Sequence, residues 1–241
     1  MTDSSASNPV SERPRRVLAV YAHPDDPEVS CAGTLARWAD EGAEVHLVIC
    51  SSGDKGQIQG DIDPTQLVEH RHGEAEAAAA VLGLASHENL GYPDGEVENT
   101  SELREQIVRR IRVQRPDTVV SCDPTAVFFG SRYINHHDHR SLGFAVLDAC
   151  APAAASPLYF PDAGEPHQVS SIYLSGTLEP DGWEDISTTI DRKVEALVCH
   201  RSQVGDDVDL VDEVVRRRAA SAGADAGLEC AEAFRILRFR F

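Results

Sequence analysis

The sequence lacks any apolar run near the length of about 18 residues that a membrane span requires. Residues 1–14 are polar and contain no apolar segment typical of a signal peptide. We therefore expect a soluble protein without a membrane span, located in the cytoplasm.

Basic residues are scarce. The 22 Lys and Arg residues face 40 Asp and Glu residues, which gives a formal net charge of -18. Such a surface repels phosphate backbones and anionic lipid headgroups. We expect no nucleic-acid partner and no binding to a membrane surface.

Paired cysteines are also missing. The six cysteines are scattered singly and form no CxxC motif, and four of them lie in or beside apolar segments: Cys31, Cys50, Cys122 and Cys150. This distribution is typical of reduced thiols that pack as small hydrophobic side chains in a cytosolic protein.

The apolar segments that are present follow an α/β pattern. Arg16–Ala22 is a short apolar run bounded by prolines, which predicts a buried strand. Gly33–Glu41 has helical composition and stops at Gly42, and a second apolar run follows at Glu44–Cys50. Strand, helix and strand in this order indicate a βαβ unit and a parallel sheet.

The pattern continues to the C-terminus. A polar, Gly-rich loop at 51–62 precedes Asp63-Pro64, an N-cap and first-turn proline that open a helix to about Leu84. Further strands are expected at 87–89, 118–121, 169–174 and 234–241, further helices at 102–115, 138–150 and 189–199, and an irregular Ala- and Pro-rich segment at 151–167. We predict a disordered arm over 1–14 and a single domain over 15–241, Rossmann-like, with a mostly parallel sheet flanked by helices.

His23-Pro24-Asp25-Asp26 directly follows the first predicted strand. Reactive groups of open parallel sheets gather at the carboxyl ends of the strands. Two adjacent carboxylates beside an imidazole repel each other unless a cation compensates them. One carboxylate would suffice to cap the next helix, so the pair favours a divalent metal with one carboxylate as ligand and the other free.

A second cluster, His136-His137-Asp138-His139, stands just before the helix predicted at 138–150. His136 and His139 are three residues apart and can face the same side of a turn that enters a helix. A neutral imidazole is a suitable zinc ligand, the other histidine could act as an acid or oxyanion donor, and Asp138 could orient an imidazole.

Together the two clusters offer His, Asp and His as ligands and leave coordination positions open, which is the layout of a catalytic metal site. The metal would lower the pKa of a water molecule, and an uncoordinated carboxylate could take its proton during attack on a carbonyl. The pattern therefore indicates a metal-dependent hydrolase.

These motifs resemble the LmbE-like family, also named for the N-acetylglucosaminyl-phosphatidylinositol de-N-acetylases (PIG-L), which includes mycothiol-pathway deacetylases. The likeness covers most of residues 16–145 and weakens beyond, with HRSQ at 200–203. It is carried by HPDD at 23–26, CAGTLARW at 31–38, SSGDKG at 51–56, RHGEAEAAAAVLG at 71–83, GYPDG at 91–95 and YINHHDHR at 133–140.

The resemblance implies a zinc-dependent N-deacetylase that removes an acetyl or other acyl group from an N-acetylglucosamine-type or similar small N-acylated substrate, such as a glycoside. It implies His23, Asp26 and His139 as metal ligands and Asp25 as the general base. It further implies that His136 stabilises the tetrahedral intermediate or protonates the leaving amine, that Asp138 tunes His136, and that Arg71 binds substrate.

The sequence departs from the family pattern at two positions. Pro27 stands before Glu28 where the family often reads HPDDE, and His137 replaces the proline of the common HPDH motif. His137 is therefore a further candidate beside His136 and His139 in the second cluster.

Other protein classes share some of these residue types or the same fold. A non-haem iron oxygenase also uses two histidines and a carboxylate, but is generally built on a jelly roll. A nucleotide-binding module would need a G-x-G-x-x-G run where this chain has two aspartates. An amidase for another small conjugate, or an inactive binding protein of the same fold, remain alternatives. The sequence leaves open the exact substrate, Zn²⁺ against Fe²⁺, and a homo-oligomer.

Overall fold

The computed structural model describes residue 10 and residues 13–56 and 63–239. Its strands are β1 (Arg16–Tyr21), β2 (Glu44–Ser51), β3 (Ser86–Tyr92), β4 (Thr118–Cys122), β5 (Phe128–Phe129), β6 (Tyr133–Ile134), β7 (Ser171–Ser175), β8 (Gly182–Asp185) and β9 (Ala231–Arg238). Its α-helices are α1 (Asp26–Ser30), α2 (Ala32–Asp40), α3 (Pro64–Leu82), α4 (Ser101–Gln114), α5 (His137–Asp148), α6 (Ile190–Cys199), α7 (Arg201–Val204) and α8 (Val208–Ala226). Ala149–Ala153 continues α5 as a π-helical turn, and Pro161–Ala163 is a short 3₁₀ turn.

Seven strands form one mostly parallel sheet in the order β3-β2-β1-β4-β7-β9-β8. β3, β2, β1, β4 and β7 run parallel to their neighbours, while β9 pairs antiparallel with both β7 and β8. The chain thus leaves β1 on one side for β2 and returns on the other side as β4. In such sheets this reversal of strand order opens a crevice at the carboxyl edge of the strands.

The hydrophobic core lies on both faces of the sheet, and the side chains of β1 contribute to both. Val17, Ala19 and Tyr21 point to one face, and Leu18 and Val20 to the other, and all five are at most 1% exposed. A strand buried on both faces reads as a continuous apolar run, as β1 does.

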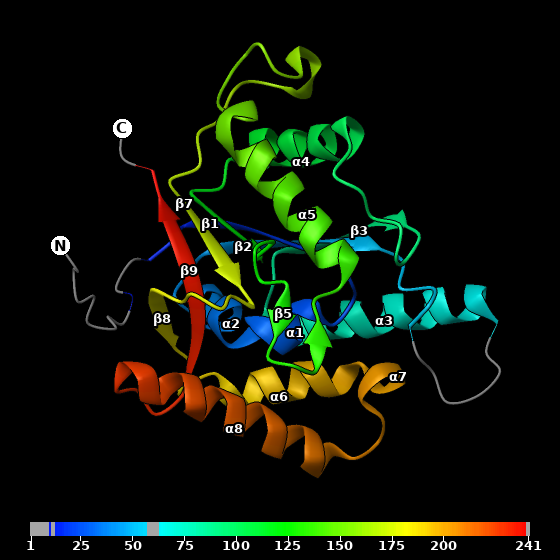
Figure 1. Ribbon diagram of the computed structural model, residues 1–241, viewed down its shortest axis with the longest axis vertical. Coiled ribbons are helices and arrows are strands. Elements are labelled where there is room, and N and C mark those ends of the chain that lie inside the picture. The colour runs from blue at the N-terminus through cyan, green and yellow to red at the C-terminus, as the bar shows by residue number, and fades with distance from the viewer. Residues whose placement is uncertain (1–9, 11–12, 57–62, 240–241) are drawn as a thin grey trace.

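Helices cover the two faces (Figure 1). On one face α4 and α5 lie against the sheet. On the other face lie α2 and α3, with α6 packed against them and α8 packed against α6 and β9. Leu103, Ile107 and Ile111 of α4 recur every four residues and are all buried, so this helix buries a single apolar stripe.

The predicted α/β class, with a mostly parallel sheet flanked by helices, is confirmed. All six cysteines are free, and Cys31, Cys50, Cys122 and Cys150 are buried as predicted. The cap of α3 also agrees, because the Asp63 carboxylate accepts a hydrogen bond from Thr65 N–H at 2.8 Å.

Several elements differ from the sequence-based expectation. β3 runs to Tyr92, well beyond the expected 87–89, because it pairs with β2 from Ser86 to Asn89 and, after a register shift, again at Tyr92. β7 begins at Ser171 and β9 at Ala231, where the prediction had 169 and 234. The elements α1, α7, α8, β8 and the β5–β6 hairpin were not predicted.

Most of the predicted disordered arm at 1–14, and part of the loop at 51–62, lie outside the described residues. Val10, within the arm, donates a backbone hydrogen bond to Trp183 O at 2.9 Å. In the described part of the chain, no helix combines the length and apolarity that crossing a membrane requires.

Candidate metal centre and active site

The loops that follow β1, β2, β3 and β4 meet at the carboxyl edge of the sheet. They carry His23 to Asp26, the 51–56 segment, Asp94, and the stretch from Asp123 to His136 respectively. Residues separated by more than a hundred positions are thereby brought into contact beside the point where strand order reverses.

His23, Asp26 and His139 form a compact triangle of possible ligand atoms. His23 Nδ1 lies 3.1 Å from His139 Nε2 and 3.3 Å from one carboxylate oxygen of Asp26. His139 Nε2 lies 3.1 Å from the other Asp26 oxygen. The three residues predicted as metal ligands thus place one nitrogen or oxygen each around a common point.

The hydrogen bonds of His23 determine which of its nitrogens faces this point with a lone pair. Its Nε2 lies 3.1 Å from Asp94 Oδ1 and 3.2 Å from Asp138 Oδ2. The pKa values of these two carboxyl groups are lowered, Asp94 chiefly by its hydrogen bond to His23. Since carboxylates only accept, Nε2 carries the proton, and in the neutral imidazole Nδ1 is left as an electron-pair donor.

His139 is oriented in the same way from the opposite side. Its Nδ1 lies 2.9 Å from the amide oxygen of Asn135, one helical turn earlier in the sequence. That oxygen is an acceptor, so Nδ1 carries the proton and Nε2 offers its lone pair. Two lone pairs 3.1 Å apart repel each other unless a proton or a cation lies between them. The donor set therefore fits a divalent cation.

The charges around the triangle favour a cation as well. Burial alone would lower the pKa of His23, but Asp26, Asp138 and Asp94 raise it to about 12. Asp26 is itself buried, yet His139 and His23 hold its pKa well below the usual value. Positive charge is thus stabilised at this position.

Asp25 is held apart from the triangle in a strained backbone conformation. Its φ of 120° lies in a region that side chains other than glycine rarely adopt, and such strain persists only where surrounding contacts enforce it. Burial and the neighbouring Asp26 carboxylate raise the pKa of Asp25 to about 7, against the lowering effect of Arg71. The side chain lines the same cavity as the triangle.

Arg71 on α3 is one of the contacts that hold this turn. The sequence alone left it as a substrate-binding residue or an exposed helical arginine, and it is not exposed, with an exposed fraction of 2%. Its guanidinium donates to Pro24 O at 2.7 Å, Gly53 O at 3.0 Å and Asp25 Oδ1 at 3.3 Å. Arg71 thus links two segments, the turn that contains Asp25 and the loop that follows β2.

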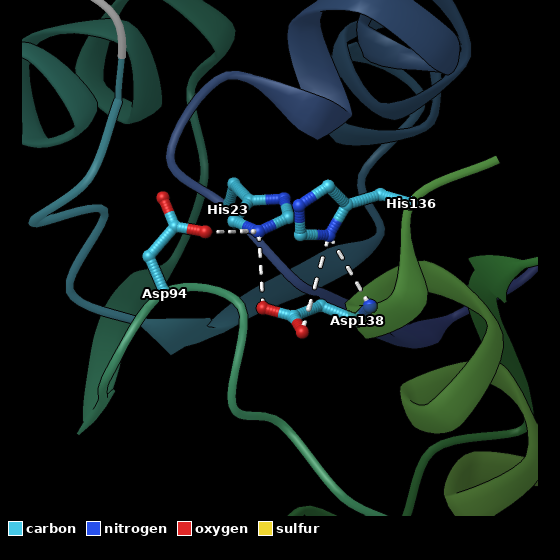
Figure 2. A group of neighbouring side chains, drawn as sticks. All are labelled: His23, Asp94, His136 and Asp138. Carbon is cyan, nitrogen blue, oxygen red and sulfur yellow. Dashed lines mark hydrogen bonds and ion pairs between the residues drawn. The ribbon is translucent and has the colours of Figure 1, made fainter. Parts of the chain in front are cut away.

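A second cluster shares His23 and contains Asp94, His136 and Asp138 (Figure 2). Its acceptors already have donors. The Asp138 carboxylate accepts from Gly95 N–H at 2.8 Å, and His136 Nδ1 accepts from Asp138 N–H at 3.2 Å. The triangle of His23, Asp26 and His139 is therefore the better candidate for a metal site, and Asp94 and Asp138 of the second cluster contact His23 from its other side.

The contacts of Asp138 and His136 in this second cluster bear on the roles predicted for them. Asp138 Oδ2 lies 3.2 Å from His23 Nε2, while its Oδ1 lies 3.9 Å from His136 Nδ1, so the carboxylate is closer to His23 than to the histidine it was expected to tune. Because His136 Nδ1 is an acceptor, its Nε2 carries the proton in the neutral ring. Burial and the nearby His23 lower the pKa of His136, which favours that neutral form.

His137, the further candidate of the HHDH segment, lies outside the cluster. Its Nε2 is 3.2 Å from Glu98 Oε1 at the protein surface, and its side chain is 44% exposed. A cavity of about 390 Å³ is lined by the metal triangle, Asp25 and His136, and His137 does not line it.

One protein family model matches the part of the sequence that forms this site. The family model for GlcNAc-PI de-N-acetylases (PIG-L) matches residues 18–150, the part of the chain that carries both clusters. The chain belongs to the PIG-L family.

Two relatives and one solved structure are similar to this chain over most of their length. A diacetylchitobiose deacetylase from Thermococcus kodakarensis is 30% identical, with 92% of this chain and 83% of the relative covered. The 1D-myo-inositol 2-acetamido-2-deoxy-alpha-D-glucopyranoside deacetylase 2 from Saccharopolyspora erythraea is 32% identical, with coverages of 83% and 88%. The structure of N,N'-diacetylchitobiose deacetylase from Pyrococcus horikoshii aligns with a TM-score of 0.84 at 28% identity, covering 93% of this chain and 84% of that one.

Three contributors to the site of this PIG-L member were not predicted. Asp94 contacts His23, Asn135 orients His139, and Lys55 lines the cavity and donates to Asp94 O at 2.6 Å. Two of them were open to a sequence argument. Asp94 stands in the loop after a strand, where reactive groups gather, and Asn135 precedes His139 by four residues, a spacing that brings side chains together.

Proposed function

We propose that this chain is a metal-dependent N-deacetylase that acts on a small N-acetylglucosamine-type glycoside. The observation that carries the proposal is the convergence of two imidazole lone pairs and the Asp26 carboxylate on one point, with a second carboxylate, Asp25, left uncoordinated in the same cavity. The named activities of the PIG-L relatives support the choice of substrate.

His23, Asp26 and His139 would hold the metal, with Zn²⁺ as the first choice and Fe²⁺ as a second, since imidazole and carboxylate ligands suit both. A bound divalent cation would supply Lewis acidity, which lowers the pKa of a water molecule and polarises the acyl carbonyl.

Asp25 acts as the general base that takes a proton from the attacking water. A pKa of about 7 lets a carboxylate accept a proton and return it near neutral pH, which is the condition for efficient acid–base catalysis. Arg71 holds Asp25 in its strained conformation, so that its side chain remains in the cavity beside the metal ligands. Arg71 thereby supports catalysis by position, and its predicted contact with substrate remains a prediction.

His136 acts on the carbonyl oxygen. With Nδ1 occupied by the Asp138 amide, the neutral imidazole presents Nε2–H as a donor. A donor fixed in advance toward developing negative charge stabilises a tetrahedral intermediate. Between the two predicted roles of His136, the geometry supports this one over protonation of the leaving amine.

The test is release of free amine and acetate from N,N'-diacetylchitobiose by the zinc-loaded protein. We expect turnover that a chelator abolishes and added Zn²⁺ restores. The Asp25→Asn variant should retain its metal but lose kcat by about 100-fold or more, the usual contribution of a positioned general base.

Asp40→Asn is the matched control, because Asp40 lies at the surface and pairs with Arg192 away from the site. Its kcat should equal that of the wild type. Wild-type turnover in metal-loaded Asp25→Asn would contradict the assigned mechanism, and absence of amine release from any N-acetylglucosaminide would contradict the proposed function.

A further inference from the structure

The α6–α7 corner, residues 200–203, has no part in the catalytic mechanism proposed above. Helix α6 lies along α3 (Figure 1), and the corner follows at its C-terminal end. The backbone of the corner is closed by its own hydrogen bonds, because His200 O accepts from Gln203 N–H at 2.8 Å and from Val204 N–H at 3.0 Å. Two buried glutamates from other helices contact this corner, and each follows a residue of the candidate site by three positions in the chain.

Glu28 of α1 is the first of these glutamates. Its Oε2 lies 3.2 Å from His200 Nε2, and the two residues are 2% and 0% exposed. Burial alone would lower the pKa of His200, but Glu28 raises it above its usual value. Asp25 and Glu74 add to this effect, so the buried imidazole is stabilised as a cation. Because removal of either partner would leave a buried charge uncompensated, the pair is a strong link between α1 and the α6–α7 corner.

Glu74 of α3 is the second glutamate, and it is also buried. Its two carboxylate oxygens accept from Ser202 N–H at 2.8 Å and from Ser202 Oγ at 2.6 Å. Glu74 follows Arg71 by about one helical turn, so the two side chains lie on the same side of α3. Arg71 in turn donates to Asp25 Oδ1 at 3.3 Å. The α6–α7 corner therefore joins α1 to α3 close to the point where Arg71 meets Asp25.

Helix α1 depends on contacts of this kind. It has only five residues, which is too short for a helix to be stable on its own. It starts directly after Asp25, whose carbonyl oxygen accepts from Val29 N–H at 3.0 Å, so a shift of the helix would displace Asp25 with it. Asp26 has contacts of its own, because its carboxylate accepts from His23 N–H at 2.8 Å and lies against both histidines of the metal triangle. Loss of the link would thus disturb the general base more than the metal ligands.

We propose that the Glu28–His200 ion pair positions the general base by holding α1 against α3, so that Asp25 keeps its strained backbone conformation and its contact with Arg71. His200 acts through Asp25, and it is not among the described residues that line the catalytic cavity. The proposal rests on the deacetylase function and deepens it, because it adds a positioning residue from a segment outside the site.

The first variant is His200→Ala, assayed as zinc-loaded protein on N,N'-diacetylchitobiose. We expect kcat to fall about tenfold or more, since a misplacement of about 1 Å can cost about 100-fold in rate. KM and the zinc content should keep their wild-type values. His200→Gln, which retains an N–H donor for Glu28, should restore most of the rate.

The same substitution in the Asp25→Asn background separates positioning from a merely structural role. His200→Ala should cause no further loss of kcat there, because a residue that acts through Asp25 has no effect once that base is removed. If His200→Ala does not fold, Glu28→Gln takes its place with the same expectations, since it keeps the shape of the side chain and removes only its charge.

Arg37→Met is the matched control. Arg37 of α2 forms an ion pair with the buried Glu184 of β8, and neither element supplies a residue to the catalytic cavity. Loss of this pair should lower the unfolding temperature, as His200→Ala does, but leave kcat of the folded protein unchanged.

Crystal structures of the variants give a readout that needs no substrate. The φ of Asp25 should leave the positive region in His200→Ala and stay near 120° in Arg37→Met. A wild-type kcat in His200→Ala would overturn the proposal, as would a φ of Asp25 that stays positive or an undiminished further loss in the Asp25→Asn background. If the wild type releases amine from no N-acetylglucosaminide while φ relaxes in His200→Ala, the positioning role stands and the deacetylase function fails. Wild-type turnover with both φ and kcat unchanged in His200→Ala has the opposite meaning.

Discussion

Two residues that would not themselves touch a metal determine how the site is arranged. Asn135 accepts from His139 Nδ1, and its own amide donates to Ala126 O at 2.8 Å, which fixes which end of the amide is the oxygen. Asp94 accepts from His23 Nε2. Each imidazole is thus held in the tautomer that directs a lone pair toward the point that the two histidines share with the Asp26 carboxylate.

Asn135→Ala should therefore weaken metal binding without removing a ligand. Loss of such an orienting partner typically lowers metal affinity by about 10–100-fold. Competition with a chromophoric zinc chelator would measure the change, with His137→Ala as a control that leaves the affinity unaltered. An unchanged zinc affinity in Asn135→Ala would show that the tautomer of His139 is fixed by something else.

At the scale of single residues, the sequence was sufficient to predict the candidate ligands that are neighbours in the chain. The pair of carboxylates at 25 and 26 beside His23 already required a cation, and the histidines near 136–139 offered a partner. The sequence did not resolve which histidine of the second cluster faces His23, because that depends on where α5 begins. Nor did it indicate that Arg71 is buried, since its three acceptors lie 18 to 47 residues away along the chain.

The elements of the sheet were predicted best where apolar runs are continuous, as in β1, β2 and β4. β8 is four residues long and pairs only with β9 at the sheet edge, so its pattern is too short to identify. Helix α8 buries a stripe of small side chains, Val211, Val215, Ala219 and Gly223, between charged residues. Small residues contribute little to an apolar periodicity, which is why this helix was not predicted.

The irregular segment after α5 is held by one side chain of α4. Arg112 is 4% exposed, and its guanidinium donates to the backbone carbonyls of Ala153, Ala154, Ser156, Tyr159, Phe160 and Gly164. The composition of 151–167 indicated irregular structure, but not that an arginine from another helix orders it.

Arg112→Leu should release this segment and lower the free energy of unfolding by about 2 kcal/mol, since buried carbonyls would lose a charged donor. Limited proteolysis should then cut between 153 and 164, and urea unfolding gives the energy. Arg110→Leu is the control, because Arg110 pairs with Glu88 near the surface and should cost less than about 1 kcal/mol. Resistance of Arg112→Leu to proteolysis would contradict this role.

At the scale of the whole molecule, the reactivity of the cysteine thiols measures how well the core is shielded from solvent. Burial raises the pKa of Cys31 and Cys150 to about 12, and raises those of Cys50 and Cys122 as well. Because the thiolate is the reactive form, these four should resist alkylation in the folded protein. Iodoacetamide at pH 8 should label only Cys199 and Cys230, and all six after denaturation, as mass spectrometry would reveal. Rapid native labelling of Cys31 or Cys122 would mean that the sheet edge near the site opens.

Four carboxylates lie together at the candidate metal site. Asp25, Asp26, Asp94 and Asp138 surround two histidines, with Arg71 as the buried counter-charge. Metal binding should therefore stabilise the fold, because only the folded chain brings these groups together.

The central claim is that His23, Asp26 and His139 together hold one divalent metal ion. Elemental analysis of the purified wild type, Asp26→Asn, His139→Ala and His137→Ala after zinc reconstitution tests it most directly. We predict about one zinc per chain in the wild type and in His137→Ala, and loss of zinc in the other two. A wild type that binds no metal after reconstitution, or a His139→Ala variant that retains its zinc, would contradict the account.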